Sequence, residues 1–552
     1  MAIERKRTLD FWGVITIAVF ALFALFLVYP LFKLLILGFR DLDSGGWSLN
    51  NFRTFFGRKY YTNAIWNSLT IGFSVTAITV VVGTLLAYFL GTFQIKGKKI
   101  LQVFIIFSMM SPSFIGAYSW VILLGRNGIF QNFFANVIGI KLPTIYGVFG
   151  IVLVLTLKMY SFIYLYVSGA LKKIDPSLLE ASMSLGCNPT KNIVQMVVPL
   201  ILPTILAAAL MVFMTSIADF GTAMLIGEGY RVLPVLVYRA FMGEMGSDAN
   251  FAAAIALIMV VLTASLYFLQ KYVIGRMSFR MRSIKSSQSK PLKGIKSVLV
   301  HAYCYILVGI SVLPQFTVIY TAFLKVQGTR FLNEFSVNSF VKMKSTILSA
   351  ATNTYTYGII AIAIIIILAI FVAYLSVRKR NALTATLDIV TVFPYIISGS
   401  ILGIMLLLVF NQKPLALSGT AAIIIVAFVI RRLPHTLRSS SAILYQLSPN
   451  TEEAAISLGS SPQKAFFKVT APLMLSGVMT GAILSWVTVI NELSASLILY
   501  TGRTKTLSVA VYENVLRGNY GNAAAIASVL MVSTALSLAL FMYATRSKEF
   551  SL

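Results

Sequence analysis

Long apolar runs alternate with short polar segments along the whole chain. Twelve of these runs approach or exceed about 20 residues, the length that an α-helix needs to cross the hydrocarbon core of a bilayer. They cover residues 11–39, 66–93, 100–124, 145–170, 198–218, 251–274, 297–324, 355–377, 386–410, 419–438, 474–498 and 523–545. The pattern predicts an all-α integral membrane protein with about twelve transmembrane helices.

Basic residues gather in the loops on one side of this predicted bundle. These loops are residues 5–7, 96–99, 271–296 and 378–380. Loops on the cytoplasmic side of membrane proteins collect Lys and Arg. We therefore expect both termini in the cytoplasm. We also expect residues 276–296 to form a basic cytoplasmic linker between a first half, 1–275, and a second half, 297–552.

The two halves repeat one another in sequence. Adding 273 to a residue number carries Glu180 to Glu453 and Gly186 to Gly459. Each half has an even number of predicted spans, so both copies insert into the membrane in the same direction. They are therefore expected to be parallel repeats of six helices, related by an axis along the membrane normal. A cavity between the halves is the natural consequence.

The most conspicuous part of each repeat is a polar loop, near 174–203 in the first copy and 447–476 in the second. In the first copy Asp175 is a good N-cap, and Gly186 can adopt the left-handed conformation that ends a helix. Each copy predicts a short helix, a sharp turn at the glycine and a second helix that returns to the membrane. One such loop could simply join two spans. Two copies at a constant offset on the same face indicate a surface for a two-fold partner.

Within these loops the pattern E-A-A-x-x-x-G resembles the signature of permease subunits of type I ATP-binding cassette importers. The residues in question are Glu180, Ala181 and Gly186 in the first copy and Glu453, Ala454 and Gly459 in the second. The resemblance covers essentially the whole chain, as two fused permease halves. It implies that each short helix couples the permease to one of two copies of a cytoplasmic ATPase. It also implies an extracytoplasmic substrate-binding protein and a place in the bacterial cell membrane.

The cargo is less well defined than the family. The fused form looks most like the permeases of the ferric iron uptake group, which implies import of ferric iron. Similar permeases carry thiamine, phosphonates, phosphorylated sugars or polyamines, so these cargoes stay open. An ion-driven secondary transporter is an alternative of another class, since such proteins also often have twelve spans in two halves. It would need charged groups inside the spans, and the doubled loop would have no role in it.

Composition and charge exclude several other functions. The chain has 45 Lys and Arg against 17 Asp and Glu, a net charge of +28. Cytoplasmic loops of a membrane protein account for this excess better than nucleic acid binding does. The two Cys and two His show no metal-ligand spacing, so no metal and no cofactor is expected in this chain. No phosphate-binding loop or catalytic constellation is recognisable, so we expect a transport subunit, not an enzyme, with ATP used by a separate ATPase.

Two acidic residues, Asp219 and Glu492, end the fifth predicted span of each half and are equivalent under the offset of 273. Ionisable groups beside a membrane pathway are functional candidates. One interpretation is a paired acidic gate near the outer face. The other is that each carboxylate only caps or orients the loop that follows its helix, and the sequence leaves both open.

Other conspicuous residues of the spans are expected to serve packing. Gly399 and Gly403 form a GxxxG pattern, which is typical of close helix contacts. Pro112 and Pro394 occupy similar places in the third span of each half and are expected to kink it.

Overall fold

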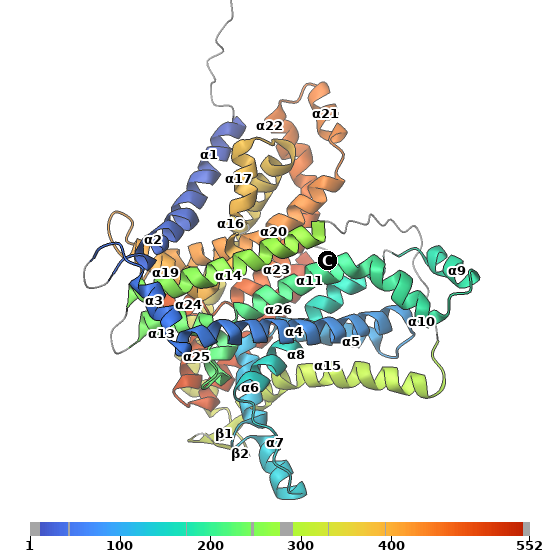
Figure 1. The fold of residues 1–552 in the computed structure, drawn as a ribbon, viewed down its shortest axis with the longest axis vertical. Helices are drawn as coiled ribbons and strands as arrows, with labels where there is room; N and C mark the ends of the chain where they lie inside the picture. Colours follow the sequence, from blue (N-terminus) through green and yellow to red (C-terminus); the bar gives the residue numbers. More distant parts are fainter. Residues whose placement is uncertain are drawn as a thin grey trace, which may run out of the picture.

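Helices make up nearly all of the molecule in the computed structural model (Figure 1). The structure describes residues 11–41, 45–172, 174–243, 248–275, 291–328, 330–391 and 393–544. The basic residues 5–7 and most of the predicted linker, residues 276–290, lie outside this part. Within the described residues the one sheet is an antiparallel hairpin of β1 (Leu324–Gln327) and β2 (Arg330–Phe335). The predicted all-α class is confirmed.

The helices follow the order of the predicted apolar runs. Those of the first half are α1 (Phe11–Phe23), α2 (Tyr29–Gly38), α3 (Asn50–Gly57), α4 (Lys59–Thr92), α5 (Lys98–Met110), α6 (Ser113–Leu124), α7 (Ile129–Phe133), α8 (Val148–Leu171), α9 (Pro176–Ser184), α10 (Pro189–Asn192), α11 (Val198–Ile217), α12 (Gly221–Ile226), α13 (Leu233–Met242) and α14 (Ala249–Gly275). Those of the second half are α15 (Gly294–Ala322), α16 (Asn338–Arg378), α17 (Ala382–Val390), α18 (Phe393–Ile396), α19 (Gly399–Phe410), α20 (Ala421–Gln446), α21 (Asn450–Ser457), α22 (Pro462–Ala465), α23 (Ala471–Ile490), α24 (Ser496–Leu499), α25 (Leu507–Leu516) and α26 (Tyr520–Ala544). Five-residue π-helical segments are η1 (Ala24–Val28), η2 (Phe134–Ile138), η3 (Ile193–Val197) and η4 (Phe466–Thr470).

Ten of the twelve predicted spans have a counterpart that is long and apolar enough to cross a membrane. Among the described residues nine helices satisfy this criterion alone, and a tenth span is a pair bent by more than 40° within 98–138. The break in that pair lies at Pro112, because a proline disfavours helical backbone at the residue before it. The two remaining runs differ from the expectation. Residues 386–410 form the three short helices α17, α18 and α19, and residues 419–438 belong to α20, which carries several arginines.

The internal repeat is visible in the order and length of the elements. α8, α9, η3 and α11 of the first half recur as α20, α21, η4 and α23, each shifted by about 273 residues. Even the five-residue π-helical segment before the fifth span is repeated. In each half the corresponding long helices pack together, α4 with α8 and α11, and α16 with α20 and α23.

The first helix of each half packs against the opposite half. α1 contacts α16 and α17, whereas α15 contacts α5 and α6. The ring of Trp12 in α1 lies 4.5 Å, centroid to centroid, from the ring of Tyr374 in α16. Tyr303 in α15 donates a hydrogen bond of 2.8 Å to the carbonyl oxygen of Val82 in α4. The two halves are therefore interlocked, and the space between them is walled by helices of both.

Candidate functional site

The predicted short helix of the first polar loop is α9. The carboxylate of Asp175 accepts hydrogen bonds from the backbone N–H of Ser177 at 3.0 Å and from its hydroxyl at 2.8 Å, which caps the start of the helix. At its end Gly186 has a φ of +86°. Its N–H donates to the carbonyl of Met183, and the N–H of Cys187 donates to that of Ser182. This pair of bonds is a Schellman motif, which needs the left-handed glycine.

The second polar loop closes in the same way around α21. Gly459 has a φ of +92°, and its N–H donates to the carbonyl of Ile456. The N–H of Ser460 donates to the carbonyl of Ala455. The predicted helix and glycine turn are therefore present in both copies, with the same hydrogen bonds at equivalent residues.

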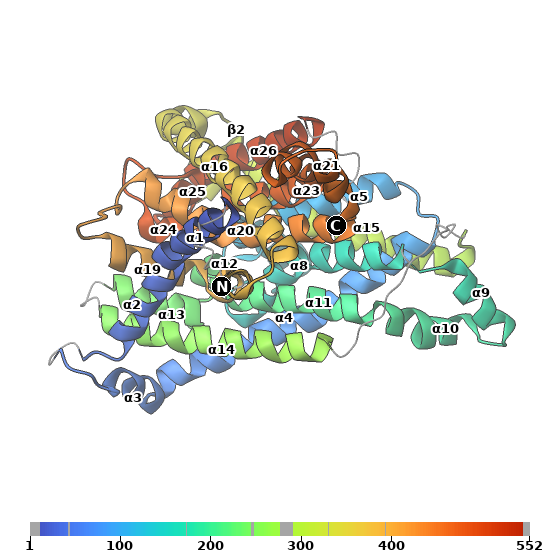
Figure 2. The same ribbon diagram turned by 90° about the horizontal axis from the view of Figure 1, so that it is seen from above.

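Both loops present the residues of the repeated motif to the outside. Glu180, Ala181, Glu453 and Ala454 are exposed. The leucine before each glycine is almost fully exposed, Leu185 to 86% and Leu458 to 88%. Figure 1 shows α9 and α21 at two separate tips of the molecule, and the view from above again separates them, with α9 at one end and α21 over the middle (Figure 2). Each loop thus carries an exposed apolar side chain beside its glycine turn.

Glu452, which the sequence analysis did not single out, attaches the second loop to the body of the molecule. One carboxylate oxygen accepts a hydrogen bond of 2.5 Å from the hydroxyl of Tyr374 in α16. The other accepts a hydrogen bond of 2.8 Å from the hydroxyl of Thr470 in η4. The position equivalent to Glu452 in the first half is Leu179, which has no carboxylate. The doubled glutamate at 452–453 was the only signal of this role in the sequence.

A cavity of about 360 Å³ lies between the two halves. Its wall comes mainly from α8 and α11 of the first half and from α20 and the end of α23 of the second. The basic residues that line it are Lys158, Arg431, Arg432 and Arg438, and the acidic residues are Asp219 and Glu492. The predicted pair of acids therefore does face a common space between the halves.

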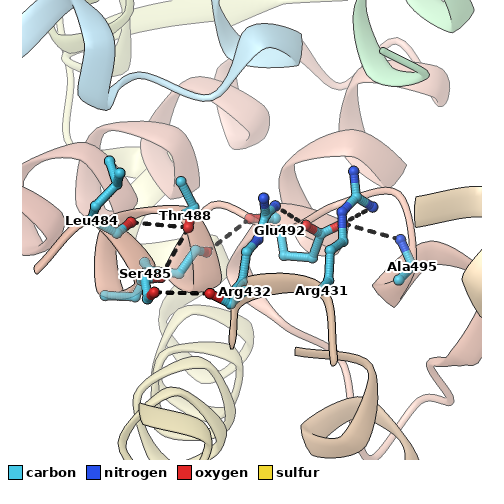
Figure 3. A network of polar contacts seen from close by, with 9 residues as sticks. Arg431, Arg432, Leu484, Ser485, Thr488, Glu492 and Ala495 are labelled. Atoms are coloured by element: carbon cyan, nitrogen blue, oxygen red, sulfur yellow. Dashed lines mark hydrogen bonds and ion pairs between the residues drawn. The ribbon is translucent and has the colours of Figure 1, made fainter. Parts of the chain in front are cut away.

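Glu492 is the centre of an ion-pair network in this wall (Figure 3). Only 2% of its side chain is exposed, and Oε1 accepts a hydrogen bond of 3.0 Å from Nη1 of Arg431. Oε2 accepts a hydrogen bond from Arg432, and the N–H of Ala495, just before α24, donates to Oε1 at 3.2 Å. A buried carboxylate needs such partners, because an uncompensated buried charge is strongly destabilising.

Asp219 makes the equivalent contact to the backbone of the first half. Its carboxylate accepts a hydrogen bond of 2.9 Å from the N–H of Thr222 in the first turn of α12. Both carboxylates thus orient the segment after their span, as one of the two interpretations predicted. Whether they also act as a gate stays a prediction.

The basic residues of the cavity were missed by sequence reasoning, although the sequence contained a signal for two of them. Lys158 and Arg431 are related by the same offset of 273 as the two acids, and each follows a long apolar run in its helix. A charge at such a depth is costly and marks a functional or paired site. Each half therefore contributes one cation and one carboxylate at equivalent places.

The two glycines of the GxxxG pattern lie in close contacts, as expected. The first of them, Gly399, also leaves space for the guanidinium of Arg431. A Cβ on Gly399 would lie 1.3 Å from Nη1 of Arg431. A Cβ on Gly403 would lie 3.0 Å from Cβ of Ile498 in α24. Among the described residues no group of three or more His, Cys, Asp or Glu is placed so that it could hold a metal ion.

Known transport proteins resemble this chain over much of its length. The ferric transport system permease protein FbpB of Actinobacillus pleuropneumoniae is 27% identical over 92% of this chain and 74% of that protein. The Fe(3+)-transport system permease protein FbpB 2 of Haemophilus influenzae is 24% identical over 84% of this chain and 87% of that protein. A Salmonella typhi protein described as a 2-aminoethylphosphonate transport system permease protein, PhnU, is 27% identical over 43% of this chain and 83% of that protein.

The model of one protein family matches the chain twice, once in each half. The matched residues are 79–279 and 365–547. Each match includes one of the two polar loops and one member of the pair formed by Asp219 and Glu492. The repeat in the sequence is thus a repeat of one permease unit. The chain belongs to the family of binding-protein-dependent transport system inner membrane components.

Proposed function

We propose that the chain forms the membrane pathway of an importer for ferric iron. The observation that carries this proposal is the similarity to ferric transport permeases, which extends over 84% to 92% of the chain and includes both halves. The similarity to the phosphonate permease covers 43% of the chain, about one half. The ferric relatives therefore match the fused arrangement itself, which favours iron over a phosphonate as the cargo.

The family also decides between the classes of transporter that the sequence left open. Binding-protein-dependent permeases are transport subunits, not enzymes, and the ATPase of such importers is a separate chain. The ion-driven alternative offers no reason for the doubled polar loop, whereas an importer driven by an ATPase does.

Two copies of the ATPase would dock on α9 and α21. The support is that both helices are exposed, end on the same glycine turn and present a leucine at the tip. Each leads through η3 or η4 into the helix that ends at Asp219 or Glu492. A displacement of either loop would therefore be transmitted along one helix to the wall of the cavity.

The polar loops would face the cytoplasm, with both termini on the same side. Arg378, in a basic segment, donates a hydrogen bond of 2.6 Å to the carbonyl of Leu447, shortly before α21. This contact puts a basic segment beside the second loop, and such segments favour the cytoplasmic side. A substrate-binding protein would then deliver its cargo to the opposite face.

The proposal is tested by uptake of radiolabelled ferric iron into cells that express the chain with its ATPase and its substrate-binding protein. Unlabelled thiamine, a phosphonate, a sugar phosphate and a polyamine serve as competitors. We expect saturable iron uptake that the double variant Glu180→Gln, Glu453→Gln abolishes while the protein still inserts into the membrane. The matched control is Glu334→Gln, an exposed glutamate on β2 that forms a salt bridge with Lys325. Uptake of one of the competitors in place of iron would overturn the iron assignment.

A further inference from the structure

The cations of the cavity are concentrated on one face of α20. Arg431, His435 and Arg438 follow one another at the spacing of successive helical turns, and Arg432 lies beside the first of them. Seven residues of an α-helix rise about 10 Å. The basic face of α20 therefore lines the cavity over about this length, in the direction of the second polar loop.

The first half has no counterpart of this face. The positions in α8 that are equivalent to Arg432, His435 and Arg438 are occupied by the apolar residues Met159, Phe162 and Leu165. Only the pair Lys158 and Arg431 is common to both halves. These three positions are thus basic in the second half and apolar in the first.

The charges of the cavity wall do not cancel. Four basic residues and two acidic residues line it, so that the formal balance is four minus two, or +2. Charges interact more strongly in the interior of a protein than in water. The wall therefore attracts an anion and repels a metal cation that arrives without negatively charged ligands.

Holding Glu492 in place explains only part of this arrangement. The two oxygens of Glu492 accept hydrogen bonds from Arg431 and Arg432, which gives these two arginines a structural role. Lys158 on α8 is also attracted to the carboxylates of Asp219 and Glu492, and the two carboxylates still leave the wall with two more positive than negative charges. One contact of Arg438 is a long hydrogen bond, 3.4 Å, to the hydroxyl of Tyr267 in α14.

We propose that the cavity binds the oxyanion groups of the cargo, and that Lys158 and Arg438 determine this specificity. This inference rests on the proposed function in one respect: iron would cross as ferric ion enclosed by carboxylate or phosphate ligands. A phosphate or phosphonate without metal has the same recognisable chemistry. Guanidinium and ammonium groups bind such oxygens through charge-assisted hydrogen bonds, and the planar guanidinium can bind two of them at once.

Binding to the purified full-length chain in lipid nanodiscs tests the proposal directly. Equilibrium dialysis would compare radiolabelled ferric citrate, phosphate, 2-aminoethylphosphonate and the cation putrescine. We expect retention of at least one oxyanion and none of putrescine. The double variant Lys158→Gln, Arg438→Gln should weaken anion binding by roughly tenfold or more, because two charged donors are lost. The matched control is Arg126→Gln, which removes an exposed arginine paired with Glu228.

Two further variants and one uptake measurement separate the explanations. The charge-retaining pair Lys158→Arg, Arg438→Lys should keep most of the anion binding, whereas a role in packing alone would not be rescued. Unfolding temperature and gel filtration identify a variant that has failed to fold. Retention of putrescine, or no retention of any anion by the wild type, would overturn the proposal. If the wild type imports a phosphonate but no iron, and this import needs both residues, the anion assignment holds and the iron proposal fails.

Discussion

In the first half the loop around α9 ends on Gly186, and in the second half the loop around α21 ends on Gly459, with the same two backbone hydrogen bonds behind each glycine. The attachment of the loops differs. Glu452 joins the second loop to α16 and η4, and the first half has Leu179 at that position. The glycine turn of the loop is thus duplicated, whereas the carboxylate that bonds to Tyr374 and Thr470 belongs to the second half alone in sequence.

The cavity wall likewise combines features that both halves share with features of the second half. Both halves place one cation and one carboxylate at equivalent positions of the cavity wall, and in the second half Glu492 forms ion pairs with two arginines. Where two repeats agree, their common task is to form a symmetrical frame. Where they differ, the second half has the additional contacts, the ion pairs of Glu492 in the cavity wall and the hydrogen bonds of Glu452 in the loop.

The largest expected effect comes from Glu492→Gln. Removal of one partner from a buried ion-pair network leaves the other charges uncompensated, so we expect a loss of about 3 kcal/mol in the free energy of unfolding. Asp219→Asn in the first half removes the charge from a contact that caps α12 and should cost about 1 kcal/mol. Unfolding in detergent, followed by circular dichroism, would measure both. Equal losses would show that the two acids have the same structural role.

The second-largest expected loss of unfolding free energy comes from filling the space that the guanidinium of Arg431 occupies beside Gly399. In Gly399→Ala the new methyl group would collide with the guanidinium, and overpacking of this kind costs about 2 kcal/mol. The matched control is Gly116→Ala in α6, the equivalent of α19. A Cβ there meets only an ordinary contact at 3.6 Å from Val154, so its effect should stay within about 1 kcal/mol. The same unfolding experiment would compare the two variants. A larger loss of unfolding free energy in Gly116→Ala than in Gly399→Ala would contradict this account of Arg431.

Tyr374→Phe tests the attachment of the second loop. It removes the hydroxyl that donates to Glu452, and a hydrogen bond to a charged group contributes about 1.5 kcal/mol. The equivalent residue of the first half is Tyr88, whose hydroxyl bonds to Thr92 within α4. Tyr88→Phe should therefore leave the first loop unaffected. Hydrogen–deuterium exchange of α21 and α9 would show the difference, and faster exchange of both loops in Tyr374→Phe would argue against a local attachment.

The sequence was sufficient for those features that depend on local patterns. Apolar runs of membrane length predicted the helices, and the repeat of Glu180 and Gly186 at a fixed offset predicted two loops with the same turn. Ten of the twelve predicted spans have a counterpart of membrane length among the described residues; the other two differ because residues 386–410 fall on three short helices and because arginines interrupt the apolar run of α20. Helix breaks of this kind depend on individual residues and on tertiary contacts, which a count of apolar residues does not include.

The cavity could be predicted only in part. Asp219 and Glu492 were found because they are rare charges at equivalent positions, and Lys158 and Arg431 share that signal. Their convergence on one space depends on the way in which α8 and α20, from different halves, line the same cavity. The role of Glu452 was hidden for the same reason, since Tyr374 lies 78 residues away in the chain.

The smallest expected effect on stability comes from the two glycine turns, and it should be equal in both halves. An alanine at Gly186 or Gly459 must adopt a positive φ, which costs about 1 kcal/mol, although nothing lies within 4 Å of the new methyl group. Because both loops are exposed, the cost should appear as local opening, with amide exchange about fivefold faster at the end of α9 or α21 and little change in global unfolding.

In the double variant of Gly186 and Gly459 we expect loss of ATPase association and of uptake, with the protein still inserted. If each single variant loses ATPase association to the same extent, the two docking surfaces are equivalent. The hydrogen bonds of Glu452 in the second loop would then affect a step that follows docking. Normal uptake in the double variant would show that the loops do not couple the permease to an ATPase.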